Sequence, residues 1–230
     1  MDIRQPGRTT RSTSSYGDIT VQCRWVFDCS GRRSSFARAL GAVRRIADKQ
    51  IAVSVVGARR HIDADLTTTI ETCLEGWWYT APFPGDRRIF TLFTNGETLA
   101  HCGARSLEGF RELAERTRHI SSLLAAGSLR NNPPEVVLAN SSVLLTAAGE
   151  QWFAAGDAAA SLDPLASAGI IDAVKSAKSA VEASLQVESR PEDYSRAVFE
   201  RYSEQLRTQS SYYRMENRWP TSGFWGRWRR

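Results

Sequence analysis

The residues best placed to do chemistry lie in one stretch, EQWFAAGDAAASLDPLASAGI, at positions 150–170. Asp157 follows Gly156 at the end of an apolar run that is typical of a buried strand. An ionised carboxylate accepts hydrogen bonds from hydroxyl groups, so Asp157 suits a sugar or a similar polyol chain. Gly156 lacks a side chain, which lets another surface approach the backbone. The stretch therefore predicts a polar ligand site at the end of a strand.

The segment after this strand supplies a second kind of partner. Asp163 is a possible cap, Pro164 makes a rigid turn, and residues 167–169 open a helix. The free N–H groups and the positive dipole end of a helix favour an anionic or electron-rich group. A flavin offers both partners, because its ribityl hydroxyls suit Asp157 and its ring edge suits the amides near Gly169. The alternative is that Gly-Asp forms only a tight turn from strand to helix.

A second acid, Asp28, ends another apolar run within VFDCSGRRSSFARALG. Ser34 is in a position to cap the short helix that follows. The order of strand and helix, β-rich middle, then strand and helix again predicts one α/β layer interrupted by a sheet that packs elsewhere. Ligands of open α/β sheets bind at the carboxyl ends of the strands. We therefore expect Asp28 and Asp157 to end neighbouring strands and to open on a common groove.

The remaining elements follow from periodicity and turn residues. A pattern of residue types typical of strands, interrupted by turn residues, predicts strands at 50–57, 67–73, 76–83, 87–95, 136–147 and 151–157. Apolar positions at helical spacing predict helices at 106–126, 170–185 and 192–215. In the second of these helices, Ile170, Val174, Ala177, Val181 and Leu185 line one face.

The two acid-bearing stretches together resemble a known superfamily. WFAAGDAAASLDPLASAGI resembles the second FAD motif of the flavin-dependent monooxygenases of the para-hydroxybenzoate hydroxylase type, which include flavin-dependent halogenases. VFDCSGRRSSFARALG resembles the Asp-Gly motif of the same superfamily, and the resemblance covers roughly residues 19–225. By this resemblance, Asp157 holds the ribityl chain and residues 164–169 face the isoalloxazine ring. The implied cofactor-binding residues are Asp28, Gly31, Arg32, Gly156, Asp157, Ala158, Pro164, Ser167, Ala168 and Gly169.

The resemblance implies a mixed α/β (α+β) fold. We expect an incomplete FAD-binding α/β domain, interrupted by an antiparallel β-sheet substrate domain and followed by C-terminal helices. Residues 1–45 and 136–190 would form the FAD-binding part, and residues 46–135 the β-rich substrate domain with one helix. Residues 191–230 would form the C-terminal helix and an aromatic, basic tail.

The segment GWWYTAPFP, residues 76–84, resembles the halogenase pattern Trp-x-Trp-x-Ile-Pro. Trp77 and Pro82 match the pattern, whereas Tyr79 replaces its second tryptophan and Ala81 its isoleucine. The resemblance makes Trp77, Trp78, Tyr79 and Pro82 candidates for a substrate wall. The alternative is that these aromatic side chains pack across a sheet, where aromatic residues are favoured.

Ala166 stands where tryptophan halogenases carry a glutamate beside the substrate. Alanine cannot act as a general base, so halogenation of free tryptophan is disfavoured, and hydroxylation or phenol-type chemistry stays open. The resemblance implies an FAD-dependent oxidoreductase, a monooxygenase of the halogenase-like branch, acting on an aromatic or indole-like substrate. Its electrons would come from a flavin reductase or NAD(P)H, and the cofactor carries the hard step. The sequence identifies no catalytic side chain, substrate or oligomeric state.

The start of the chain, MDIRQPGRTTRSTSSYGD, cannot form the strand, G-x-G-x-x-G turn and helix that bind the FAD pyrophosphate in this superfamily. The halogenase-type lysine, which belongs to that region, has no counterpart either. We therefore expect this chain alone to bind FAD weakly or not at all. An inactive remnant or an interaction module of the superfamily is the alternative.

Composition and residue spacing argue against several other classes of protein. The net charge of +5 is spread over the 230 residues without a block of like charges, so we expect no nucleic-acid partner. No apolar run approaches the ~20 residues of a membrane span, the start of the chain has no apolar core typical of a signal peptide, and a reduced cytoplasm fits. Widely spaced cysteines and histidines indicate neither a metal site nor a disulfide framework. The tryptophans and arginines of the tail suit either a membrane surface or docking on the chain's own domain.

Overall fold

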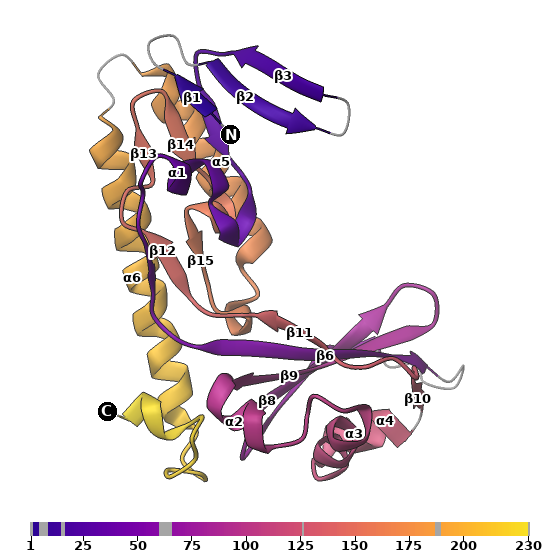
Figure 1. The fold of residues 1–230 in the computed structure, drawn as a ribbon. Helices are drawn as coiled ribbons and strands as arrows, with labels where there is room; N and C mark the ends of the chain where they lie inside the picture. The colour runs from indigo at the N-terminus through magenta and orange to yellow at the C-terminus, as the bar shows by residue number, and fades with distance from the viewer. Residues whose placement is uncertain are drawn as a thin grey trace. The chain divides into compact units, whose positions relative to one another are not determined.

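The computed structural model describes residues 2–4, 9–14, 17–59, 66–125, 127–186 and 190–229 (Figure 1). The chain divides into two compact units. Unit 1 combines residues 1–47 and 141–209, and unit 2 combines residues 48–140 and 210–230. The expected third segment, 191–230, is not separate, because helix α6 (Pro191–Met215) belongs to unit 1 as far as residue 209 and the rest of the chain joins unit 2.

Unit 1 contains the two predicted acid-bearing strands as direct neighbours. Strand β4 (Val26–Asp28) pairs in parallel with β14 (Trp152–Ala154), and Asp28 lies opposite Ala154. Strand β13 (Ala148–Gly149) extends this sheet on the other side of β14. All three residues of β14 are buried, whereas in β4 only Asp28 is buried and Phe27 is 37% exposed. The predicted pairing of the two strands is confirmed, and Asp28 ends β4 as expected, whereas Asp157 lies beyond the end of β14, in the 3-10 turn η2 (Gly156–Ala158).

A second small sheet of unit 1 is antiparallel. Strand β12 (Ser142–Leu144) lies between β15 (Ala160–Ser161) and β5 (Arg44–Ile46). The predicted strand at 136–147 is therefore wrong in extent. It is divided between β12 in unit 1 and β11 (Glu135–Leu138) in unit 2. At the start of the chain, β1 (Asp2–Arg4), β2 (Thr9–Ser14) and β3 (Gly17–Gln22) form a further antiparallel sheet.

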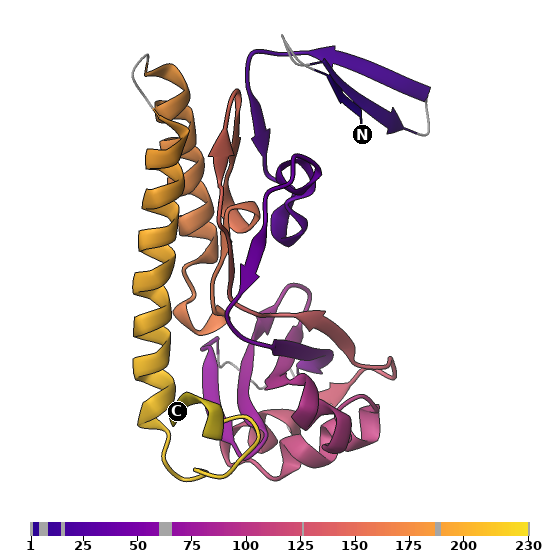
Figure 2. The same cartoon turned by 60° about the vertical axis from the view of Figure 1, so that its left-hand side comes forward.

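The helices of unit 1 pack on these strands. Helix α5 (Gly169–Leu185) runs beside α6 (Figure 2), and the Tyr194 hydroxyl of α6 donates hydrogen bonds to the carbonyls of Ala154 (2.8 Å) and Ser176 (3.3 Å). Tyr194 also packs edge-on against Phe153. One buried core thus joins the parallel strands to both helices. The expected helices at 170–185 and 192–215 are confirmed to within one residue at each start.

The short helix α1 (Ser35–Ala39) is capped differently from the prediction. Ser34 adopts a left-handed conformation, with a φ of 45°, and its side chain makes no cap hydrogen bond. Instead, Asp28 Oδ2 accepts a hydrogen bond from the Ala37 amide at 2.9 Å. Ser34 Oγ donates to the carbonyl of Ala158 at 2.8 Å, so this side chain connects the two predicted motifs.

Unit 2 is built on an antiparallel sheet whose strand order is β10-β6-β9-β8-β7, with β11 also paired to β6. The strands are β6 (Gln50–Arg59), β7 (Thr69–Cys73), β8 (Gly76–Phe83), β9 (Arg87–Asn95) and β10 (Gly127–Leu129). Runs rich in β-branched and aromatic residues, bounded by turn residues, predict β8 and β9 with their observed bounds, and both strands are buried along most of their length. The mixed fold class with an antiparallel sheet and C-terminal helices is confirmed.

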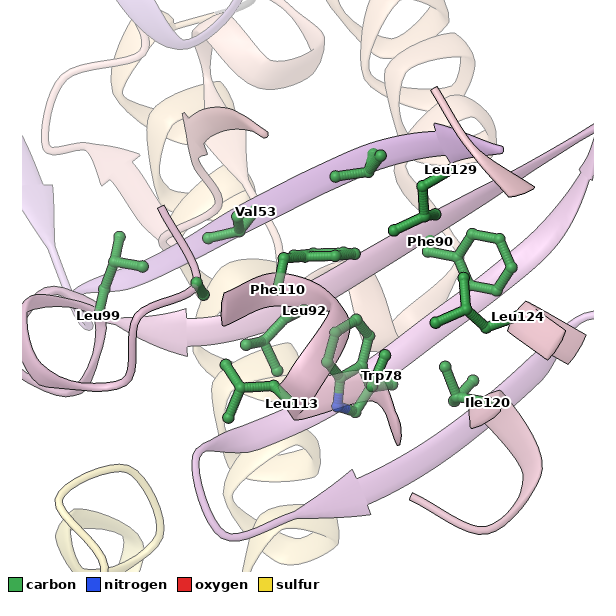
Figure 3. Close-up of a cluster of buried hydrophobic side chains, with 13 residues drawn as sticks. Val53, Trp78, Phe90, Leu92, Leu99, Phe110, Leu113, Ile120, Leu124 and Leu129 are labelled. Carbon is green, nitrogen blue, oxygen red and sulfur yellow. The ribbon is translucent and has the colours of Figure 1, made fainter. Parts of the chain in front are cut away.

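Helices cover one face of this sheet and enclose a hydrophobic core (Figure 3). Trp78, Phe110, Leu92 and Ile120 are fully buried there, and Trp78 and Phe110 meet edge to face at 4.9 Å. Burying each such side chain contributes about 1.5–3 kcal/mol. The helices concerned are α2 (Gly96–His101), α3 (Leu107–Glu115) and α4 (His119–Ala125).

The single helix predicted at 106–126 is wrong, because α3 ends at Glu115 and α4 begins at His119. Glu71, on strand β7, accepts hydrogen bonds from the amides of residues 118, 119 and 120. Burial acts to raise the pKa of Glu71, but these three amide donors outweigh it and lower the pKa. A carboxylate from a distant strand therefore starts a new helix where periodicity suggests a continuous one.

The aromatic tail docks on unit 2. Phe224 and Trp225 are 0% and 3% exposed, and Trp225 Nε1 donates to the carbonyl of Cys73 at 2.7 Å. Ser222 Oγ donates to the carbonyl of Leu74 at 2.9 Å. The tail ends in the short 3-10 helix η4 (Gly226–Arg229). Of the two alternatives for this tail, the structure shows docking on the chain's own domain.

Candidate functional site

Unit 1 contains a pocket of about 230 Å³. Most of the residues that line it come from the second motif, from the first turns of α5, and from α6. Arg32, from the loop after Asp28, lines the same pocket, so both motif loops open on it. Besides Arg32, six other predicted cofactor-binding residues line the pocket. They are Gly156, Asp157, Pro164, Ser167, Ala168 and Gly169.

The turn that carries Asp157 is shaped by its glycine. Gly156 has a φ of +58°, and a Cβ at this position would lie 3.1 Å from the Cβ of Ala173 on α5. The surface that approaches Gly156 is thus helix α5, which the sequence did not specify. The Gly156 amide also donates to Ser176 Oγ at 2.7 Å. The strand end and the helix are held close together as a result.

The Asp157 carboxylate is accessible at the pocket. Its side chain is 44% exposed and lies 3.5 Å from Arg32 Nε, whose side chain is 32% exposed. An ion pair this exposed contributes little stability, typically ~0–1 kcal/mol. Asp157 can therefore exchange this contact for hydroxyl donors of a ligand at low cost, while Arg32 keeps a positive charge beside it.

Asp28 has a different role in the structure. It is 3% exposed, and Oδ1 accepts hydrogen bonds from the amide of Ser30 at 3.0 Å and from its hydroxyl. With Oδ2 engaged by Ala37, both carboxylate oxygens are used inside the loop. Asp28 and Gly31 are not among the pocket-lining residues, and neither is the buried Ala158. The acid organises the loop that presents Arg32.

The start of α5 leaves room for a ligand. A Cβ added to Gly169 would meet nothing within 4 Å, and the capping position, Ala168, makes no side-chain cap hydrogen bond. Asp163 does cap the preceding 3-10 turn η3 (Pro164–Ala166), accepting from the Leu165 amide at 2.8 Å. Its other oxygen accepts from Gln209 Nε2 on α6 at 2.7 Å, which fixes this turn on unit 1.

Several residues that line the pocket were not predicted from the sequence. Asp172 on α5 pairs with Arg201 on α6, and its side chain is 16% exposed. Its Oδ2 is buried and has no hydrogen-bond partner among the residues that the structure describes. Tyr202 and Val198, also on α6, line the same pocket. Asp172 is an acidic residue within an otherwise apolar helix start, and this pattern could have identified it as a site residue. Nothing in the sequence shows that α6 would pass beside it.

The aromatic residues of 76–83 all lie in unit 2. Trp77 is 2% exposed, stacks on Phe93 with ring centroids 4.0 Å apart, and donates from Nε1 to the hydroxyl of Tyr213 at 2.8 Å. Trp78 lies in the core on the helix-covered face (Figure 3). Their burial favours the packing alternative for these two, whereas Tyr79 and Pro82 are only half-buried.

The structure also bears on a reactive thiol, a metal site and a membrane span. Burial raises the pKa of the Cys73 thiol to about 12, which makes it unreactive at neutral pH. Among the residues that the structure describes, no three His, Cys, Asp or Glu side chains gather as a metal site would require. Over the same ranges, no helix is both long and apolar enough to cross a membrane.

The chain is similar in sequence to one curated protein. No protein-family model matches the chain. A protein named FAD-dependent oxidoreductase LodB, of Marinomonas mediterranea, is 27% identical over 213 residues, which are 92% of this chain and 58% of that protein. The chain thus spans little more than half the length of this curated relative.

Solved structures share the fold over nearly the whole chain. The flavin-dependent halogenase CmlS has a TM-score of 0.84 at 23% identity and covers 100% of this chain, which matches 44% of CmlS. The myxobacterial chondrochloren halogenase CndH has a TM-score of 0.80 at 18% identity, covering 99% of this chain and 56% of CndH. The peptidyl tryptophan dihydroxylase QhpG has a TM-score of 0.78 at 17% identity, covering 99% of this chain and 53% of QhpG. The fold of the chain is therefore similar to that of these flavin-dependent halogenases and of the dihydroxylase, and its sequence is similar to part of an FAD-dependent oxidoreductase.

Proposed function

We propose that this chain forms the flavin-ring and ribityl side of an FAD-dependent monooxygenase of the halogenase-like branch. The observation that carries the proposal is the shared pocket, where Asp157, Arg32 and the start of α5 meet. The relationship to FAD-dependent oxidoreductases supports the choice of cofactor. Because the chain matches only part of each relative, the activity is proposed for the whole protein.

The residues present fit a flavin in part. Asp157 would accept hydrogen bonds from the ribityl hydroxyls, and the open backbone at Gly169 would lie at the ring edge. Pro164, Ser167 and Ala168 would form the adjoining wall. When bound, the flavin supplies the redox chemistry with O₂. The protein's own residues would orient it, keep water away and hold charge beside the ribityl chain. The other cofactor-binding candidates, Asp28, Gly31 and Ala158, would shape the loops.

The proposed substrate is an aromatic or indole-like group, with a flavin reductase or NAD(P)H as the electron source. Structural likeness to a peptidyl tryptophan dihydroxylase and to halogenases supports an aromatic substrate. Ala166 occupies the position of the halogenase glutamate and has no group that can accept a proton. Hydroxylation is therefore favoured over halogenation of free tryptophan. Tyr79 and Pro82 stay the better substrate-wall candidates, and a cytoplasmic location stays a prediction.

Titration of FAD, followed by flavin fluorescence, tests the proposal on this chain. Weak binding is expected of residues 1–230 by themselves, because none of the cofactor-binding residues proposed here is assigned to the pyrophosphate, and each missing charged hydrogen bond costs ~1.5–3 kcal/mol. Two or three such losses move a micromolar ligand to roughly millimolar. An extended protein that carries a strand, G-x-G-x-x-G turn and helix together with residues 1–230 should bind FAD tightly.

The Asp157→Ala variant of that extended protein should bind FAD roughly ten- to a hundredfold more weakly, since one charged acceptor is lost. Asp193→Ala is the matched control, because Asp193 is an exposed acid of α6 that pairs with Arg196 of the same helix. Equal affinity of the Asp157→Ala variant and the extended parent protein would contradict the assigned role. Absence of any flavin binding in the extended protein would instead favour the alternative, an inactive or purely interacting relative.

A further inference from the structure

Arg44 has no role in the proposed flavin site so far, but it contacts the loops beside the pocket. Arg44 begins strand β5, and its guanidinium reaches four different parts of unit 1. Nε donates to Ser142 Oγ of β12 at 2.9 Å, and Nη2 donates to Ser161 Oγ of β15 at 2.9 Å. These two bonds fix the guanidinium on the small antiparallel sheet.

The remaining bonds of Arg44 hold the two motif loops. Nη2 donates to the carbonyl of Asp157 at 2.7 Å, and Nη1 donates to the carbonyl of Ala158 at 3.1 Å. Nη1 also donates to Ser34 Oγ, whose own hydroxyl donates to Ala158. Ser34 follows the Asp28 loop, so a single side chain connects the loop of Arg32 to the loop of Asp157.

The five hydrogen bonds match the five N–H donors of a guanidinium, so no donor is left for a ligand. Every acceptor is an uncharged oxygen. Burial and the neighbouring Arg32 lower the pKa of Arg44, and the Asp157 carboxylate opposes this. An arginine stays charged under such a shift, so Arg44 adds a fixed positive charge beneath Asp157 as well as a rigid fork.

We propose that Arg44 is a positioning residue that locks the Arg32 and Asp157 loops together, so that the Asp157 carboxylate faces the pocket in a fixed direction. A lysine cannot replace it, because an ammonium group has three donors and no planar fork. The proposal deepens the proposed function, and its relevance to flavin binding rests on that function. The locking of the loops does not depend on any ligand.

Hydrogen exchange measured by mass spectrometry on the full chain, without ligand, tests the locking. Arg44→Met should raise exchange of the amides at 156–161 at least tenfold, and Arg44→Lys should give a smaller rise. Arg45→Met is the matched control, because Arg45 is the adjacent exposed arginine, and its guanidinium lies over the Phe199 ring 5.0 Å from the centroid. This control should leave residues 156–161 unchanged.

Unchanged exchange in Arg44→Met, or an equal rise throughout unit 1, would overturn the proposal, since the second result describes general loss of stability. If Arg44→Met fails to fold, Ser161→Ala removes one of the five acceptors and should raise exchange in the same segment by a few fold. Absence of that rise would also count against the locking.

A second arm measures FAD affinity in the extended protein described above. Arg44→Met should weaken FAD binding by about tenfold, with partial recovery in Arg44→Lys, whereas Arg45→Met should bind normally. If the extended parent protein binds no FAD, the proposed function fails while the exchange result still decides the role of Arg44. If exchange rises but FAD affinity is unchanged, the positioning of Asp157 for a flavin is refuted.

Discussion

At the scale of single residues, buried polar side chains are connected by consecutive hydrogen bonds. In unit 2, Trp77 Nε1 donates to the Tyr213 hydroxyl, which donates in turn to Gln50 Oε1 at 3.1 Å. All three residues are nearly or fully buried. A buried polar group without a partner is costly, so these residues specify one packing of the sheet against the chain end.

We expect Tyr213→Phe to lower the free energy of unfolding by about 1–3 kcal/mol, because the change leaves the Trp77 N–H and the Gln50 carbonyl unpaired while keeping the aromatic ring. Urea denaturation followed by tryptophan fluorescence measures the effect. Tyr212→Phe is the matched control, since Tyr212 is 60% exposed, and its midpoint should not move. Equal midpoints for the Tyr213 variant and the parent chain would contradict the importance of this chain of bonds.

At the scale of elements, single carboxylates connect distant segments. Glu71 starts α4, and Glu216 ties the tail to β7 by accepting from Thr72 Oγ1 at 2.7 Å. Arg218 donates to both oxygens of Glu216. The Arg218 hydrogen bond outweighs burial and, with Thr72, lowers the pKa of Glu216 to about 2 from an ordinary 4.5.

This lowered pKa predicts an acid-sensitive tail. The folded state favours the charged form, so its contribution is complete above pH 4.5 and is lost as the pH falls toward about 2. Because Arg218 is exposed, we expect only about 1–2 kcal/mol rather than the ~3 kcal/mol that the full shift would give. Glu216→Gln should lower the free energy of unfolding by this amount at pH 6. At pH 2.5 the difference between the variant and the parent should be much smaller, and a constant difference would contradict the assignment.

At the scale of the whole molecule, the apolar face of α5 stands out. The predicted stripe does lie on one side of the helix, but the exposed fractions of Ile170, Val174 and Leu185 are 84%, 67% and 76%. An exposed apolar face of this kind usually marks a contact surface or an aggregation risk. The face belongs to the helix whose start lines the pocket.

We expect the chain to self-associate through this face at micromolar concentration, because water-exposed apolar area favours contact between copies. Replacing Val174 and Leu185 together by glutamine should reduce the weight-average mass seen by light scattering, without lowering the melting temperature. Lys175→Gln, an exposed polar change on the same helix, serves as the control. If the double variant associates as strongly as the parent, the face is not the contact.

The sequence by itself determined the local elements and the two motifs. Residue types typical of strands, bounded by turn residues, placed β8 and β9, and the apolar runs before Asp28 and Asp157 predicted strands there, because these signals act over a few residues. The tertiary structure decided what depends on distant partners. Glu71 broke the predicted helix at 106–126, Asp28 replaced Ser34 as a cap, and the 136–147 strand was divided between units. The role of Arg44 likewise appears only once β5 lies beside both loops, since hydrogen bonds between segments about a hundred residues apart leave no local pattern.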